Sequence, residues 1–240
     1  MIIIGNGRLI TRNAAEPYYE NGAVVTENEL IKETGTTAEM RLKYPDAEFV
    51  DAKGGVIMPA FINAHTHIYS ALARGLSIAG YNPTNFYEVL DGMWWKIDRS
   101  LTLEDTRRSA YTTIIDCIKT GCTTIFDHHA SFCQIEGSLF AIADAAKALG
   151  IRACLCYEVS ERDGEKKCDE SIEENKSFID HCERENDSML KAMFGGHALF
   201  TIGDKTFEKC VKANGGRTGF HIHVCEGMND VYDSMKNYGC

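Results

Sequence analysis

Two pairs of histidines, each pair spaced one residue apart at the end of an apolar run, constrain this chain more than any other feature. Residues 55–67 read GVIMPAFINAHTH, and residues 218–226 read TGFHIHVCE. Side chains alternate faces along a strand, so both histidines of a pair point the same way. One pair among eight histidines would be weak evidence. Two pairs at strand ends, the second followed by a glutamate, predict a metal site.

The first apolar run has no helical period and predicts a buried strand, with Pro59 at its start or at an edge. Neutral imidazole suits zinc and ferrous iron, and a catalytic site keeps one position open for water. The pKa of that water falls towards about 7, which makes hydroxide available at neutral pH. Glu226, three residues after His223, is placed to move protons without binding the metal. We expect His221 to be packed and hydrogen-bonded.

Composition excludes several classes of protein. The chain has 240 residues, a net charge of −10 and no run rich in lysine or arginine, so nucleic acid and anionic membranes are not expected partners. The N-terminus lacks the features of a signal peptide, and no apolar stretch approaches the roughly 18 residues that span a bilayer. Ten cysteines without a CxxC pair favour free thiols in a reducing cytoplasm.

The chain is expected to divide at residue 57. Residues 1–57 predict a small β unit, with short strands at 2–4, 22–26, 29–33 and 48–51 and helical turns within 38–44. In residues 58–240 strands alternate with helices, which predicts a parallel sheet with helical crossovers. The strand candidates are 56–64, 122–127, 151–158, 190–196 and 217–224. The helix candidates are 102–120, 138–149, 169–185, 205–214 and 229–237.

Polar residues gather where the predicted strands end, and in parallel α/β folds the sites form at those ends. The first strand ends at His65 and His67, the second at Asp127, His128 and His129, the third at Glu158 and the fifth at His223 and Glu226, and His197 follows the fourth. His197 is a candidate electrophile or hydrogen-bond donor to substrate, with a purely structural role as the alternative. Asp127 and His128 either support the metal ligands or cap a strand.

A long connection, residues 68–101, follows the first strand and carries many aromatic residues. Connections of this length often form lids or binding loops. Residues 86–97 are open to two interpretations, an amphipathic helix that packs on the core or a wall of the substrate pocket. The two are compatible.

Several motifs together resemble a known family. MPAFINAHTH at 58–67, followed by ALARG at 71–75, resembles the amidohydrolase superfamily, and within it the branch of chlorohydrolases and amino-heterocycle deaminases. TTIFDHH at 123–129 and FHIH at 220–223 resemble the aminohydrolases associated with selenium metabolism. The resemblance implies a (β/α)₈ TIM barrel with a small β-sandwich built from both chain ends. It implies His65, His67 and His223 as metal ligands, Glu226 as proton shuttle and His197 as a substrate contact.

Two departures accompany the resemblance. Ala60 stands where the family commonly has glycine, which affects only the turn before the strand. The sequence also accommodates about five of eight β/α units. A sixth-strand histidine and an eighth-strand aspartate of the family are not in it. We therefore expect 1–57 to be the N-terminal part of the sandwich, 58–240 to be an incomplete hydrolase barrel, and this piece alone to be inactive.

The sequence thus predicts a cytoplasmic, metal-dependent aminohydrolase that deaminates an amino-substituted heterocycle by hydrolysis of a C–N bond. One divalent ion is expected, with zinc ahead of iron. The expected partner is a small-molecule substrate, and assembly into a homo-oligomer is an open alternative. The alternatives are hydrolytic dechlorination at the same site, a non-catalytic half-barrel and, more weakly, a cysteine-rich metal or selenium carrier.

Overall fold

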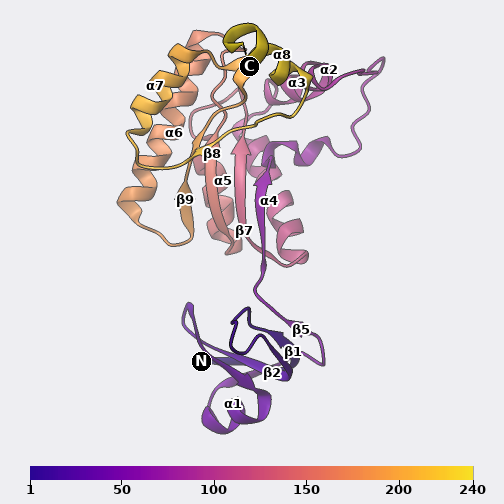
Figure 1. Ribbon diagram of the computed structural model, residues 1–240, viewed down its shortest axis with the longest axis vertical. Coiled ribbons are helices and arrows are strands. Elements are labelled where there is room, and N and C mark those ends of the chain that lie inside the picture. Colours follow the sequence, from indigo (N-terminus) through magenta and orange to yellow (C-terminus); the bar gives the residue numbers. More distant parts are fainter. Residues whose placement is uncertain (240) are drawn as a thin grey trace. The chain divides into compact units, whose positions relative to one another are not determined.

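The computed structural model describes residues 1–239 and divides the chain into two compact units, Met1–Ala60 and Phe61–Cys240. The first unit is a sheet of order β3-β2-β1-β4, with β5 also paired to β1 and helix α1 beside it (Figure 1). A small core of Ile3, Ala23, Val25 and Met40 lies within this unit. Its elements are β1 (Ile2–Ile10), β2 (Tyr18–Glu27), β3 (Leu30–Thr36), α1 (Thr37–Lys43), β4 (Glu48–Asp51) and β5 (Val56–Ile57).

The strand predicted at 56–64 is two strands. Val56–Ile57 pairs in parallel with β1, and a separate strand, β6, begins at Phe61. Pro59 lies between them, and proline has no N–H with which to continue a ladder. Pro59 therefore interrupts the predicted strand. One strand ends before it and another begins after it.

The second unit contains the parallel sheet that the alternating pattern predicts. Its order is β6-β7-β8-β9, and a further parallel pair, β10 and β11, follows (Figure 1). The N–H of His197 donates to the carbonyl of Val159 at 2.9 Å, which ties the chain after β10 to the chain after β8. The strands are β6 (Phe61–Thr66), β7 (Cys122–His129), β8 (Arg152–Tyr157), β9 (Leu190–Ala192), β10 (Phe194–Gly195) and β11 (Phe220–His221).

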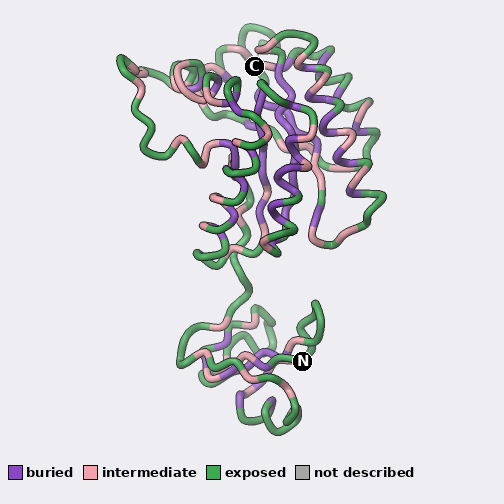
Figure 2. The backbone as a smooth tube through the Cα atoms, turned by 180° about the vertical axis from the view of Figure 1, so that it is seen from behind, coloured by how far each residue is buried: buried purple, intermediate pink, exposed green. Residues whose placement is uncertain are grey.

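The predicted crossover helices are confirmed, with small changes at their ends. They are α4 (Leu103–Lys119), α5 (Ser138–Leu149), α6 (Glu165–Glu185), α7 (Asp204–Asn214) and α8 (Met228–Tyr238). Thr102 and Asp105 form the capping box that starts α4. The inner faces of the helices and the central strands are the buried parts of this unit (Figure 2). No helix within residues 1–239 has the length and apolarity needed to cross a membrane.

Strand β6 is more exposed than the sequence suggests. Phe61 and Ile62 are 56% and 62% exposed, so the prediction of a buried strand is wrong for β6. The cause is its position, since β6 pairs with β7 on one side and with no other strand of the described residues. The central strand β7 has partners on both sides, and Ile125 is fully buried there.

A buried asparagine on α6 joins β8 to β10. Oδ1 of Asn175 accepts from the N–H groups of Tyr157 (2.9 Å) and Gly195 (3.1 Å). Its amide group donates to the carbonyls of Tyr157 (2.8 Å) and Ser171 (3.0 Å). The backbones approach closely here, because a Cβ on Gly195 would lie 2.1 Å from the Tyr157 carbonyl oxygen. Asn175 thus satisfies backbone groups at the ends of two strands that lead into the polar rim.

The long connection 68–101 is largely helical. It contains η1 (Ile68–Ala73), α2 (Phe86–Val89), the π-helical segment η2 (Leu90–Trp94) and α3 (Trp95–Asp98). Leu90 and Trp95 are buried in this stretch. The helix predicted over 86–97 is present. Its packing role and its pocket-lining role both hold, since Phe86, Trp94 and Trp95 also line a cavity.

Candidate metal centre

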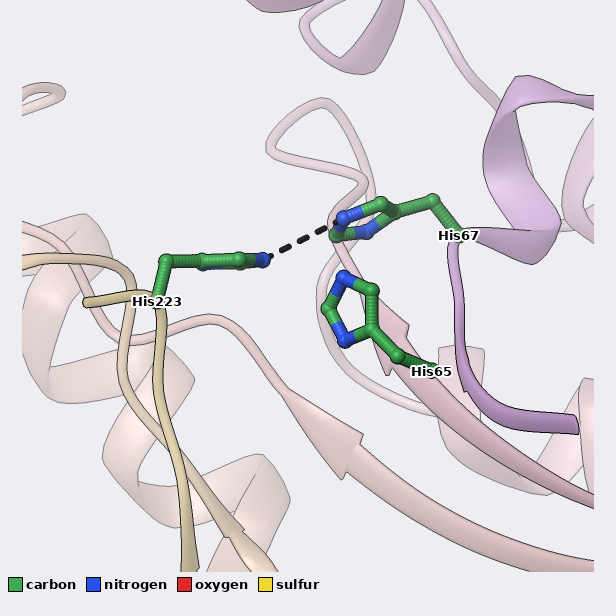
Figure 3. A group of neighbouring side chains, drawn as sticks. All are labelled: His65, His67 and His223. Carbon is green, nitrogen blue, oxygen red and sulfur yellow. Dashed lines mark hydrogen bonds between the residues drawn. The ribbon is translucent and has the colours of Figure 1, made fainter. Parts of the chain in front are cut away.

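Three histidines predicted as metal ligands converge at the rim of the sheet. His65 lies in β6, His67 follows that strand, and His223 follows β11. One ring nitrogen from each lies within 4.8 Å of the others, a grouping that can hold a metal ion (Figure 3). His223 is buried, His67 is half-buried and His65 is exposed. The two histidine pairs, about 156 residues apart, thus meet as the spacing predicts.

Backbone carbonyls determine which nitrogen of His67 and His223 carries the proton. Nδ1 of His67 donates to the carbonyl of His128 at 2.7 Å, and Nδ1 of His223 donates to the carbonyl of His197 at 2.9 Å. In a neutral ring the other nitrogen then has only a lone pair. Burial lowers the pKa of His67 to about 4, so this ring is neutral at pH 7. The two Nε2 atoms nevertheless face each other at 3.2 Å, as the dashed line in Figure 3 shows.

Two facing lone pairs require a cation between them. Zinc–nitrogen bonds of about 2.0–2.1 Å at a tetrahedral angle place two nitrogens about 3.3 Å apart, close to the observed separation. A shared proton would satisfy this pair, but a metal ion would also be within reach of the third imidazole, His65. Three imidazoles with space for further ligands are a donor set that suits zinc or iron. The residues present therefore fit a divalent metal ion.

His221 supports His65. Nδ1 of His65 and Nε2 of His221 are 2.8 Å apart and share one hydrogen bond. Burial is the main cause that lowers both pKa values, that of His221 to about 4, so both rings are neutral at pH 7. If His65 donates from Nδ1, its Nε2 is free for a metal. This contact agrees with the expectation that His221 is hydrogen-bonded to a neighbour.

Asp127 and His128 hold the chain that carries His67. Oδ1 of Asp127 accepts from the N–H of Ile68 at 2.6 Å, directly after His67. Burial raises the pKa of Asp127 to about 8, although the Ile68 N–H opposes the shift. His128 accepts from His67 through its carbonyl, and its own Nε2 donates to the carbonyl of Gly196 at 2.9 Å. Both residues therefore contact the groups that orient His67.

A cavity of about 190 Å³ opens beside His67 and His223. Glu158, His197 and Glu226 contribute polar groups to its wall. Its apolar wall is formed mainly by Tyr69, Phe86, Leu90, Trp94 and Trp95. A larger apolar cavity of about 510 Å³, beside η3 (Leu199–Thr201), α7 and α8, shares only His223 with it. The smaller cavity is thus the one that joins polar groups to the metal centre.

His197 lies in this cavity with a defined tautomer. The hydroxyl of Thr201 donates to the carbonyl of Ala198 at 3.0 Å, so it accepts from Nδ1 of His197 at 2.7 Å. Burial lowers the pKa of His197, although Glu158 opposes the shift. The neutral ring therefore offers Nε2 as an acceptor. The donor role considered from the sequence requires a protonated ring.

The sequence places Glu158 at the rim but assigns it no role, and it does not identify the cluster behind it. Arg162 makes a two-point contact with Asp98 (2.6 and 3.3 Å) and donates to Oε1 of Glu158 at 3.1 Å. The guanidinium lies over the rings of Phe132 (4.1 Å) and Trp95 (5.2 Å). The position of Glu158 after a strand is a signal in the sequence. The Asp98–Arg162 contact, 64 residues apart, has no such signal.

Comparisons with known proteins agree with this architecture. A sequence profile described as the Amidohydrolase family matches residues 56–240, and one described as an imidazolonepropionase-like composite domain of bacteria matches residues 22–47. The chain is 30% identical to a 5'-deoxyadenosine deaminase of Methanosarcina barkeri over 239 residues, covering 99% of this chain and 52% of that protein. It is 29% identical to a 5-methylthioadenosine/S-adenosylhomocysteine deaminase of Syntrophomonas wolfei, with the same shares covered. The chain spans about half the length of these relatives.

Solved structures share the fold. An adenosine deaminase from Xanthomonas campestris with bound zinc superposes with a TM-score of 0.78 at 21% identity, covering 99% of this chain and 52% of that one. Atrazine chlorohydrolase TrzN from Arthrobacter aurescens TC1, complexed with zinc, gives a TM-score of 0.78 at 21% identity, covering 100% and 56%. The profile match covers most of the chain, and the sheet, its helices and the rim of polar residues are consistent with it. The chain belongs to the amidohydrolase family.

Proposed function

We propose that this protein is a metal-dependent aminohydrolase that removes an amino group from a heterocycle by hydrolysis of a C–N bond. His65, His67 and His223 hold one divalent ion in this proposal, with zinc ahead of iron. The observation that carries it is the pair of Nε2 atoms of His67 and His223, which face each other at 3.2 Å at the edge of a cavity. Family membership and the names of the relatives, which are deaminases, support the reaction type.

The bound ion supplies a water molecule that is activated for attack at neutral pH. Residues of the chain itself carry out the other steps. Glu226 lines the same cavity as His67 and His223 and is exposed, so its carboxylate can take a proton and pass it to the departing amino group. His197 contacts the ring through Nε2. The aromatic wall orients a planar ring by stacking and excludes water from one side.

Purines are the first substrate class to test. The relatives are named for 5'-deoxyadenosine, 5-methylthioadenosine and S-adenosylhomocysteine, and one structural neighbour is a guanine deaminase from E. coli with a TM-score of 0.79 at 16% identity. The alternative, hydrolytic dechlorination, has the same centre and a different leaving group. A structural neighbour is a chlorohydrolase, so a chlorinated triazine belongs in the same panel.

The proposal extends to finer points that rest on sequence resemblance. We place the protein in the selenium-associated branch because of the stretches 123–129 and 220–223, and in the cytoplasm because of its cysteine content. Residues 1–57 are proposed as part of a small β-sandwich and 58–240 as part of the hydrolase barrel.

The test is release of ammonia by the zinc-loaded full-length protein from adenosine, 5'-deoxyadenosine and guanosine, with chloride release from a chlorinated triazine measured in parallel. Ammonia from at least one purine, and its loss in a His65→Ala, His67→Ala variant, is the expected result. Chloride release without ammonia would favour dechlorination. Neither product, in a protein that binds zinc, would contradict an enzymatic role on these substrates.

A further inference from the structure

Three polar side chains of the cavity wall, those of Glu158, Glu226 and His197, each present an acceptor. Glu158 and Glu226 contribute carboxylates, and the neutral ring of His197 contributes Nε2. None of the lining residues is a lysine or an arginine. Tyr69, Trp94 and Trp95 also line the cavity and each carries an O–H or N–H, so a donor from the ligand is needed only at an acceptor that no group of the protein already satisfies.

Glu158 is the most constrained of these acceptors. The residue is 3% exposed, and Arg162 donates to its Oε1. The nearest ring nitrogen to Oε2 is Nδ1 of His128 at 3.9 Å. His128 donates from Nε2 to Gly196, so its Nδ1 carries a lone pair and cannot donate to Oε2. Within residues 1–239, Oε2 has no hydrogen-bond donor.

The cluster behind Glu158 keeps its carboxylate ionised and correctly oriented. Burial by itself would raise the pKa of Glu158, but the Arg162 guanidinium and the surrounding imidazoles outweigh burial and hold the pKa below its ordinary value. Arg162 lies over the rings of Phe132 and Trp95 and is bonded to Asp98, so contacts other than Glu158 also position its guanidinium. One oxygen is therefore held by Arg162, and the other remains available at the cavity wall.

We infer that Glu158 is a specificity-determining residue whose Oε2 accepts a hydrogen bond from an N–H on the substrate ring. This inference rests on the proposed function for the identity of the ring. It narrows the substrate class to amino-heterocycles that can present a ring N–H to Glu158, as guanine can. A ring with only acceptor nitrogens on that edge would place its lone pair against the Glu158 carboxylate.

The test compares two ribosides that differ at this edge. Guanosine has an N–H at ring position 1 and a carbonyl at position 6, whereas 2-aminopurine riboside has an acceptor nitrogen and a C–H there, with the same sugar. The Glu158→Gln comparison below separates the effect of the N–H from that of the carbonyl. Binding is measured by titration calorimetry on zinc-loaded full-length protein carrying Glu226→Gln, so that turnover is slow. We expect guanosine to bind at least about tenfold more tightly, the contribution of one hydrogen bond to a charged group.

The Glu158→Gln substitution then separates recognition from structure. Its amide oxygen can still accept from Arg162, which turns the amide NH₂, a donor, toward the cavity. The preference for guanosine should disappear or invert, whereas a purely structural role would weaken both ribosides equally. Glu161→Gln, the same chemical change at an exposed residue that does not line this cavity, should leave the ratio unchanged. Zinc content should be the same in all variants.

Each other outcome overturns the inference. An unchanged ratio in Glu158→Gln, tighter binding of 2-aminopurine riboside by the parent protein, or no binding of either riboside would do so. If Glu158→Gln weakened the ribosides but not the free bases, the donor would be a sugar hydroxyl and the ring assignment would be wrong. If Glu158→Gln did not fold, the ratio of the two riboside affinities in the parent protein would still test the inference. A guanosine preference without ammonia release would leave the inference standing and contradict the proposed function.

Discussion

Replacing Asn175 by alanine should be among the most destabilising single changes in the second unit. The amide satisfies the N–H and carbonyl of Tyr157 and the N–H of Gly195, and Asn175 and Tyr157 are fully buried. Leaving a buried backbone group without a partner costs about 1–3 kcal/mol. Three such groups give roughly 3–9 kcal/mol, and water that enters the vacated space satisfies some of them, so we expect roughly 3–5 kcal/mol.

The assay is urea denaturation at pH 7, followed by far-ultraviolet circular dichroism and by the fluorescence of Trp94 and Trp95. The control is Asn237→Ala, which removes an exposed asparagine on α8 and should change the free energy of unfolding by less than about 0.5 kcal/mol. A cost below about 1 kcal/mol for Asn175→Ala would refute the view that this amide holds β8 and β10 together.

Asn175→Asp gives a second test with a defined pH dependence. The carboxylate keeps the two acceptor contacts but faces the carbonyls of Tyr157 and Ser171 without a proton to donate. Burial and these carbonyls should raise its pKa in the folded state above the unfolded value of about 3.9. Its stability relative to the parent should therefore be greatest at low pH and fall as pH rises through the folded-state pKa. A pH-independent difference would contradict this reasoning.

Three further predictions concern the centre and one helix. A His65→Ala, His67→Ala variant should contain little zinc, as measured by elemental analysis. Full zinc occupancy in this variant would contradict the assignment of these residues as ligands. Glu226→Gln should keep zinc and fold while turnover falls by roughly 10²–10⁴, whereas unchanged turnover would make Glu226 a surface carboxylate. Thr102→Ala should cost about 1 kcal/mol in urea denaturation, with Thr102→Ser near neutral. Hydrogen bonds from Thr102 lower the pKa of Asp105, so this contribution should be present above about pH 4 and be lost as pH falls further.

Local sequence signals predict many helix ends of this fold, because capping and turn formation depend on residues that are neighbours in the sequence. A capping box at Thr102 and glycines with positive φ at 121 and 150 mark helix ends that the structure reproduces closely. The break between β9 and β10 has no local signal, since the chain pairs with β8 up to Ala192 and with β11 from Phe194 onward. The exposure of β6 likewise depends on which strands flank it, and a sequence pattern does not contain that information.

Some features of the candidate centre can likewise be predicted from the sequence, and others depend on the folded structure. His65, His67 and His223 are identifiable because strand geometry relates their spacing to their direction. The partners that set the tautomers of His67 and His223 are backbone carbonyls of His128 and His197, and these become neighbours only in the folded chain. Glu158 is placed at the rim by its strand, but its unpaired oxygen follows from Arg162 and His128, whose positions only the structure provides.

The distance along the chain between the two halves of the centre has a consequence for biosynthesis. A ribosome that adds roughly 5–20 residues per second needs about 8–31 s to pass from His67 to His223. During that interval the nascent chain carries a two-histidine half-site that lacks its third imidazole, so it can hold an ion only weakly. If these three histidines hold the ion, tight binding therefore has to await the synthesis of His223, which follows β11.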